Sequence, residues 1–200
     1  MFNKIMKKFL LPIALALFSF SANAADSYIF DPHHTSVVWT ANHFGFSNPS
    51  GKFSEVEGDL MLDEKNPAQS KVNVSVKMVN IFTGYSNFDN HLKGADFFNI
   101  EKFTTATFVS KKVTITGKNT AKVVGDLTLL GVTKPVTLNT KLNKIAVSPI
   151  TQKRTAGFTA NAVIKRSDFG LNYAIPSVGD IVKLVIEAEA TAVNNETEKK

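Results

Sequence analysis

Near its C-terminus the chain carries the stretch Val182-Lys-Leu-Val-Ile-Glu-Ala-Glu-Ala-Thr-Ala192, in which apolar residues occupy every second position. Successive side chains of a β-strand point to opposite faces of the sheet. One face of this segment is therefore apolar from Val182 to Ala192, whereas Lys183, Glu187 and Glu189 lie on the other. The pattern predicts a long strand with one buried face.

The same alternation recurs through most of the chain. It is clearest in Lys71–Met78, where Val72, Val74, Val76 and Met78 share one face. Parallel strands covered by helices would give continuous apolar runs and need crossover helices, which the pattern does not provide. We therefore predict an all-β protein of eight or nine antiparallel strands. The rougher runs that complete the set are 36–44, 52–62, 104–110, 113–117, 122–130, 136–142 and 155–165.

A closed barrel and a two-sheet sandwich both fit this pattern. Small residues favour a barrel with space inside, because Ala156, Ala160 and Ala162 alternate with larger residues on one strand. An eight-stranded barrel can give such volume to a single ligand. The alternative is that large neighbours such as Phe108 and Phe158 fill it.

The segment Phe82–Phe98 interrupts the alternation. It contains four phenylalanines, a histidine and two aspartates among strands on either side. We predict a short helical segment near residues 86–94 that acts as a lid or rim over an apolar cavity.

The first 24 residues have the features of a secretory signal peptide. A basic start with Lys4, Lys7 and Lys8 is followed by an apolar run, and Ala22-Asn-Ala24 supplies the small residues before a cleavage point. We expect removal after Ala24 and a soluble, exported protein. The apolar run is too short to cross a bilayer, and no longer one follows, so stable membrane insertion is not expected. Residues 25–193 are predicted to form one domain and residues 194–200 a flexible tail.

Charge and cysteine content exclude several classes of protein. Without the three lysines of the signal segment, 20 basic residues face 17 acidic ones, and the net charge is +3. The basic residues are scattered, whereas nucleic-acid binding needs them clustered on one face. The chain has no cysteine, which excludes disulfides and thiolate chemistry.

Five short motifs occur along the chain after residue 24. They are Asp31-x-x-His34, Asn42-His-Phe-Gly45, Asp89-x-His-Leu-Lys93 with Asp96-Phe-Phe98, Gly125–Val136 and Arg166-Ser-Asp-Phe-Gly170. In this order they resemble the YceI-like family of periplasmic polyisoprenoid-binding proteins, and the resemblance covers essentially all of the chain after residue 24. It implies a periplasmic location and an eight-stranded, lipocalin-like barrel that holds a polyisoprenoid, an isoprenoid quinone or a similar long amphiphilic lipid.

One position departs from the family pattern. An arginine often precedes the aspartate of the Asp-x-His-Leu motif, and here that residue is Phe88. A hydroxyl, quinone or phosphate head group would therefore be contacted in this protein by residues other than an arginine at this position. Arg166 and Asp168 are expected to form an ion pair that fixes a turn.

The resemblance and the alternation together give a set of expected ligand-binding residues. Those expected on the inner wall are Trp39, Val74, Val76, Phe108, Leu127, Phe158, Ala160, Leu184 and Ile186. Those expected at the rim are His43, Phe44, Phe88, His91, Leu92, Phe97, Phe98 and Phe169. We expect no cofactor and no catalytic residue, and the sequence leaves a homodimer open.

The polar residues suggest two other functions. The imidazoles of four histidines can bind zinc or copper, and Asp31 or Asp89 could accept a hydrogen bond from a ligating ring. The spacing of these histidines, His33, His34, His43 and His91, matches no compact ligand motif. A lipid-modifying enzyme would need an activated nucleophile or an acid–base pair. Ser36 has no nucleophile-elbow pattern, and Asp89 and His91, two apart on a helix, would not face each other. We therefore expect neither a metal site nor catalysis.

Overall fold

The computed structural model describes residues 25–193. The predicted signal peptide and the predicted C-terminal tail lie outside these residues. One α-helix, α1 (Ser86–Lys93), and eleven strands are formed within them. The strands are β1 (Asp26–Phe30), β2 (Ser36–His43), β3 (Ser50–Phe53), β4 (Glu57–Leu62), β5 (Lys71–Lys77), β6 (Ile81–Phe82), β7 (Thr105–Gly117), β8 (Thr120–Leu129), β9 (Val132–Val147), β10 (Arg154–Lys165) and β11 (Val178–Ala192).

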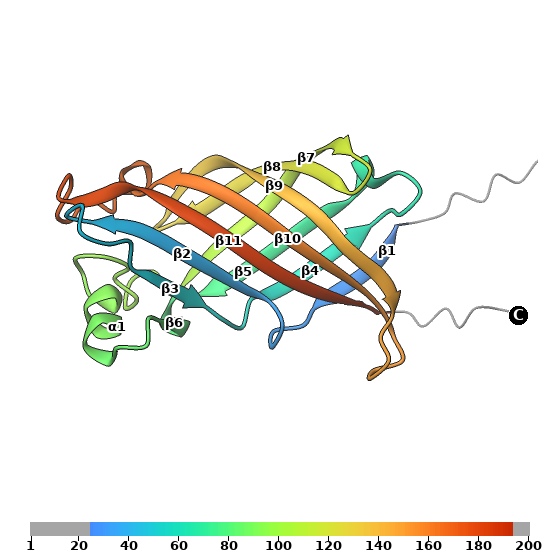
Figure 1. Cartoon of the computed structure of the whole chain (residues 1–200), viewed down its shortest axis with the longest axis horizontal. Helices are drawn as coiled ribbons and strands as arrows, with labels where there is room; N and C mark the ends of the chain where they lie inside the picture. Colours follow the sequence, from blue (N-terminus) through green and yellow to red (C-terminus); the bar gives the residue numbers. More distant parts are fainter. Residues whose placement is uncertain (1–24, 194–200) are drawn as a thin grey trace, which may run out of the picture.

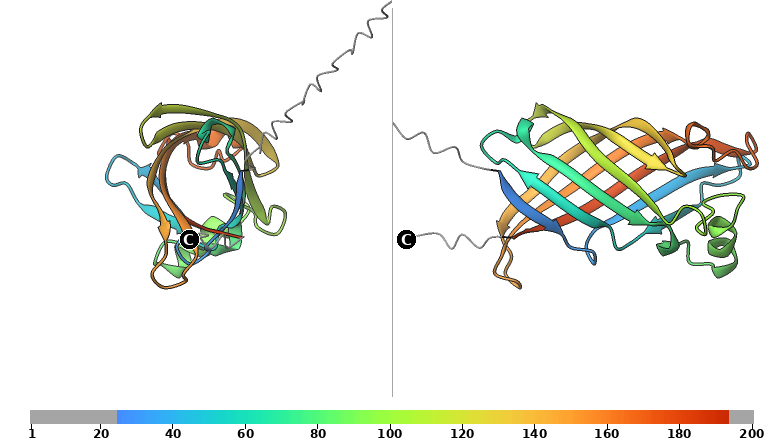
Figure 2. Two further views of the ribbon diagram at one scale, coloured as in Figure 1. Left: turned by 90° about the vertical axis from the view of Figure 1, so that its right-hand side faces the viewer. Right: turned by 180° about the vertical axis from the view of Figure 1, so that it is seen from behind.

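The strands close into a barrel because β11 is long enough to pair with two strands on one side. Its final residues pair with β1, as Ala192 does with Tyr28, and its middle pairs with β2, as Leu184 does with Trp39. Next to β1 come β4 and then β5, and next to β2 come β3 and then β6. Each of these two rows of short strands therefore covers part of the length of the barrel. The eleven strands therefore occupy eight positions around one antiparallel ring, seen end-on in Figure 2. The predicted eight-stranded barrel is confirmed, and the sandwich alternative is wrong.

Alternation in β11 has the predicted consequence. Val182, Leu184, Ile186 and Ala188 line the interior, whereas Lys183, Glu187 and Glu189 are exposed. Because the period of a strand is two, each strand of the ring contributes one row of apolar side chains to the inside.

Several predicted strand boundaries are wrong. The run 52–62 is two strands, because Glu55 has a positive φ of 56° and breaks the extended chain between β3 and β4. The runs 104–110 and 113–117 are one strand, β7, whose register shifts between Ser110 and Lys112 where a bulge interrupts the alternation. Strands β1 and β6 were not predicted, since neither is long enough to show a period.

The alanines of β10 and β11 lie in two different environments. Ala160 and Ala188 line the interior, as the barrel hypothesis requires. Ala156 and Ala190 are instead fully buried in a cluster with Tyr28 and Phe30, where β1 pairs with the end of β11. Large neighbours therefore fill part of the volume that the alanines leave, but not all of it.

The helical prediction is confirmed, since α1 spans Ser86–Lys93. The helix lies beside β6 at one end of the barrel, at the lower left of Figure 1. We call this end the helix end. It also contains the β2–β3 loop and the chain between β10 and β11. The opposite end, with the β7–β8 and β9–β10 turns, is the hairpin end.

Replacing Gly58 by alanine is expected to lower the free energy of unfolding by about 3 kcal/mol or more. Gly58 has a φ of +147°, and an added Cβ would overlap the carbonyl oxygen of Asn73 and lie 2.7 Å from Cα of Val74 on the paired strand. Backbone atoms cannot move aside without opening the β4–β5 pairing. Gly157→Ala is the control, since nothing lies within 4 Å of its added Cβ. Urea unfolding of both variants measures the difference, and equal stabilities would contradict it.

Candidate functional site

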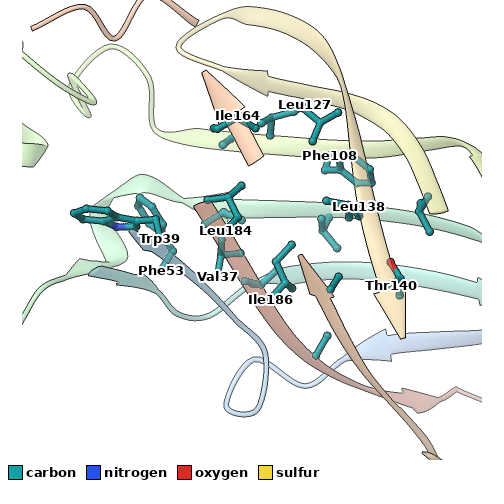
Figure 3. A pocket seen from close by; sticks show the side chains of 18 of the residues that line it. Val37, Trp39, Phe53, Phe108, Leu127, Leu138, Thr140, Ile164, Leu184 and Ile186 are labelled. Carbon is teal, nitrogen blue, oxygen red and sulfur yellow. The ribbon is translucent and has the colours of Figure 1, made fainter. Parts of the chain in front are cut away.

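A cavity of about 820 Å³ occupies the barrel interior. Aliphatic and aromatic side chains dominate its wall, and Figure 3 shows them converging from opposite sides of the ring. A volume of this size lies in the usual range for sites that enclose a small ligand. The residues labelled there are Val37, Trp39, Phe53, Phe108, Leu127, Leu138, Thr140, Ile164, Leu184 and Ile186.

The cavity is long relative to its width. Its lining reaches from Phe44 and Tyr173 at the helix end to Lys118 and Asn119 at the hairpin end. The portion of β11 that contributes to it, from Val178 to Ala188, is about 33 Å long at ~3.3 Å per residue. With a strand tilt of ~40° this corresponds to about 25 Å along the barrel axis. The shape suits a linear apolar chain.

Sixteen of the seventeen predicted site residues line this cavity. Their contact with a ligand stays a prediction, but their common location does not depend on one. The sixteen are Trp39, His43, Phe44, Val74, Val76, Phe88, His91, Leu92, Phe97, Phe98, Phe108, Leu127, Phe158, Ala160, Leu184 and Ile186.

The predicted position of Phe169 at the rim is wrong. It belongs to the 3₁₀ turn Arg166–Phe169, which leaves the barrel wall after β10, and its side chain is buried. It lines a separate cavity of about 270 Å³ together with Asp96, Phe103 and Leu130. A strand period cannot place a residue in a turn.

The segment Phe82–Phe98 packs its aromatic rings against the barrel. Phe88 meets Trp39 edge to face at 6.4 Å between ring centroids, and Phe98 meets Phe53 at 5.4 Å. Leu92 is almost completely buried beneath the helix. These contacts are favourable beyond the area that they bury, so the segment forms an ordered wall at the helix end.

Asp89 and His91, the acid–base pair weighed above, have separate partners. The Asp89 carboxylate accepts hydrogen bonds from Thr83, from the backbone N at 2.7 Å and from Oγ1 at 2.6 Å. The ring of His91 packs edge to face on Phe97 and Tyr173, and its Nε2 lies 3.4 Å from Asp96 Oδ2. The aspartate thus fixes the start of the helix, and the histidine joins an aromatic group at the cavity wall.

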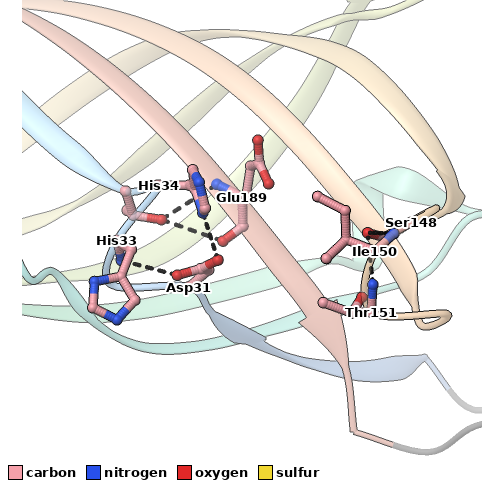
Figure 4. Close-up of polar contacts among 8 residues, drawn as sticks. Asp31, His33, His34, Ser148, Ile150, Thr151 and Glu189 are labelled. Carbon is pink, nitrogen blue, oxygen red and sulfur yellow. Dashed lines mark hydrogen bonds and ion pairs between the residues drawn. The ribbon is translucent and has the colours of Figure 1, made fainter.

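The four histidines do not gather at one point. Among residues 25–193, the group close enough to share an ion is Asp31, His34 and Glu189. It lies in the β1–β2 loop against β11, where Asp31 Oδ2 is 2.7 Å from His34 Nδ1 (Figure 4). The hydrogen bond from His34 lowers the pKa of Asp31, and Asp31 raises the pKa of His34. None of the three lines the cavity.

Arg166 holds backbone segments together at the helix end, and the sequence did not predict this role. Its side chain is 5% exposed and lines the cavity. The guanidinium donates hydrogen bonds of 2.7–2.9 Å to four backbone carbonyls, those of Leu171, Tyr173, Val178 and Gly179. Burial lowers its pKa. The predicted ion pair with Asp168 is therefore wrong: Arg166 fixes the turn through the backbone.

A second acidic group supports the same turn. Asp180 accepts hydrogen bonds of 2.9 Å from the backbone N and the hydroxyl of Ser167. These bonds lower the pKa of Asp180. Two side chains of opposite charge thus hold the chain between β10 and β11 without a direct bond to each other.

A closed antiparallel barrel with one elongated apolar cavity places the protein among the lipocalin-like barrels. Residues 28–190 match the YceI-like domain, and the chain belongs to this family. Protein YceI of Escherichia coli O17:K52:H18 is 40% identical over 188 residues, covering 92% of this chain and 97% of the relative.

Solved structures agree with this assignment. A YceI protein of Campylobacter jejuni is 30% identical, with a TM-score of 0.67 over 75% of this chain and 88% of its own. BcnA of Burkholderia cenocepacia has a TM-score of 0.73 at 23% identity, over 81% of this chain and 99% of its own. A polyisoprenoid-binding domain from Saccharophagus degradans, implicated in plant cell wall breakdown, has a TM-score of 0.63 at 12% identity, over 82% and 98%. The last two likenesses show the fold alone.

Among the helices within residues 25–193, none has both the length and the apolar character needed to cross a membrane.

Proposed function

We propose that the protein binds a polyisoprenoid or a similar long-chain amphiphilic lipid inside the barrel and carries it in the periplasm. The observation that supports this is the elongated apolar cavity of about 820 Å³. The proposal extends to this chain the class of ligand of the polyisoprenoid-binding domain from Saccharophagus degradans, which shares its fold.

The energetics favour a hydrocarbon chain. Each methylene moved from water into an apolar site contributes roughly 0.8 kcal/mol. Ordering of the chain and loss of its translational freedom offset much of the sum. Entry and release are therefore harder to achieve than affinity, and the segment Phe82–Phe98 is our candidate for the part that moves.

Binding without catalysis is the simplest role for this lining. Asp89 and His91, the acid–base pair that the sequence suggested, are engaged with Thr83 and with an aromatic group. Export to the periplasm is part of the proposal. β1 begins at Asp26, so removal of residues 1–24 would leave each described strand intact.

Native mass spectrometry tests the proposed function. The mature protein, purified from the periplasm without detergent, is expected to carry a lipid with a long isoprenoid or acyl chain, recovered chemically unchanged. A mass equal to that of the polypeptide alone, in protein that also takes up no added isoprenoid, would refute it.

Phe88→Arg is expected to raise affinity for isoprenoids with an anionic head group about tenfold, with the preference for chain length unchanged. The arginine would project from α1 to the cavity wall near Trp39, and a hydrogen bond to a charged group is worth about 1.5–3 kcal/mol. The chain has one tryptophan, Trp39, so its fluorescence can report occupancy directly.

Tyr85→Arg is the matched control for this variant. It adds the same charge at the same end of the barrel, but Tyr85 is exposed and does not line the cavity. Equal gains in the two variants would show that long-range attraction, and not a contact in the cavity, is responsible.

A further inference from the structure

The side chain of Phe46 is 91% exposed at the tip of the loop between β2 and β3. The loop is nonetheless well ordered by hydrogen bonds. The backbone N of Phe46 donates to the carbonyl of His43 at 3.0 Å, and that of Gly45 donates to Asn42 Oδ1 at 2.8 Å. Phe44 is held at a positive φ of 53°, which is unfavourable for a residue with a bulky side chain. The fold therefore holds the ring of Phe46 in water, although the backbone conformation of Phe44 in the same loop is unfavourable.

The exposed ring is continuous with the cavity. Phe44 and Pro49, on either side of it in the loop, both line the cavity. The backbone N of Phe44 donates to the carbonyl of Ser177 at 2.8 Å, which fastens this loop to the chain between β10 and β11. Tyr173 of that second segment is 45% exposed and also lines the cavity. We call residues 44–49 and 170–177 together the docking face.

Charge distinguishes the docking face from the other end of the barrel. Neither of its segments contains Asp, Glu, Lys or Arg, although one fifth of the chain is charged. At the hairpin end the cavity lining includes Lys71, Lys118 and Glu64, and Glu64 is paired with Arg154 at 2.6 Å. Removing charged groups from water is unfavourable, so the docking face, and not the hairpin end, is the surface that can enter an apolar medium.

The exposed aromatic area of the docking face is small for a contact with a second protein chain. The exposed parts of Phe44, Phe46 and Tyr173 amount to roughly 400 Å², because an aromatic side chain buries about 150–250 Å². Stable protein interfaces need about 800 Å² from each partner. Aromatic rings do favour the interface between lipid head groups and hydrocarbon.

We propose that the docking face seats the protein on the surface of a lipid bilayer, with Phe46 inserted among the acyl chains and the helix end of the cavity facing the membrane. The inference rests on the proposed function for the identity of the cargo. A lipid that leaves the bilayer through this face enters the cavity without crossing water.

Vesicle flotation and lipid transfer test this proposal with the variant Phe46→Ser. The vesicles contain phosphatidylethanolamine and phosphatidylglycerol, and the cargo is an isoprenoid alcohol whose uptake is read from the change in Trp39 fluorescence. We expect the variant to float, and to take up cargo from vesicles, about tenfold less than the unaltered protein, as loss of one inserted ring implies. Uptake of a short, water-soluble isoprenoid in the absence of vesicles should be unchanged.

Ile150→Ser is the matched control. Ile150 is 90% exposed in the β9–β10 turn of the hairpin end, and no residue of that turn lines the cavity (Figure 4). Flotation and transfer should be unaffected by this change.

Each other outcome has a definite meaning. Flotation and transfer at the unaltered rate in Phe46→Ser would overturn the proposal, as would an equal loss in Ile150→Ser. If Phe46→Ser instead converted a dimer to a monomer in sedimentation, a second copy would be the occupant and the proposal would be wrong. A protein that floats through Phe46 but takes up no isoprenoid would retain the docking face and refute the proposed function alone.

Discussion

Ala160→Phe is expected to weaken binding of a long-chain isoprenoid at least about 100-fold. Ala160 lies on β10 between Thr140 and Ile186 on the neighbouring strands, and all three line the cavity. A phenyl ring at this point would narrow the cavity partway along its length. The chain beyond the ring would stay in water, and exclusion of only three or four methylenes accounts for the loss.

The measurement is titration of the variant with isoprenoids of increasing length, followed by Trp39 fluorescence. Short chains should still bind, because the helix end of the cavity is unchanged. Ala188→Phe narrows the cavity from β11 and serves as a second variant if the first is poorly folded. Val163→Phe, on the outer face of β10, is the control and should bind like the unaltered protein. If both inward variants kept full affinity for long chains, the ligand would not occupy the cavity.

The architecture was predictable from the sequence wherever one strand face is long and uniform. β11 shows this, because its alternation continues from Val182 to Ala192 and its inward residues follow from the period alone. The ring closure was less accessible, since it depends on β1, where Tyr28 and Phe30 are the only inward residues. Two residues do not establish a period. The bulge near Ser110 misled the prediction for the opposite reason, because it divides one strand into two patterns.

The residues of the candidate site were predictable where they lie on a long, regular strand, and not elsewhere. Trp39, Leu127 and Leu184 line the cavity because each lies on the inward face of a regular strand. The sequence could not show which alanines leave space, since Tyr28 is distant in sequence from Ala156 and Ala190 but packs in one cluster with them. Arg166 was misjudged because its partners are backbone carbonyls, which look alike in every sequence.

Arg166→Met is expected to lower the free energy of unfolding by about 3–5 kcal/mol. Methionine matches much of the length of the side chain but leaves the carbonyls of Leu171, Tyr173, Val178 and Gly179 without their donor. Lysine should restore little, because an ammonium group cannot reproduce the planar fork of donors that reaches four acceptors.

The functional consequence should follow from the same bonds. Tyr173, Ala174 and Val178 line the cavity and depend on Arg166 for their backbone conformation, so ligand affinity should fall even in variant protein that is fully folded at low temperature. Hydrogen exchange should speed up between residues 170 and 179 and change little in β7 and β8. Lys165→Met removes the same charge from the adjacent exposed position and is the control. Equal losses of stability and affinity in the two variants would mean that positive charge alone stabilises this end of the barrel. Losses confined to Arg166→Met would mean that the hydrogen bonds of one buried guanidinium hold the loop in place.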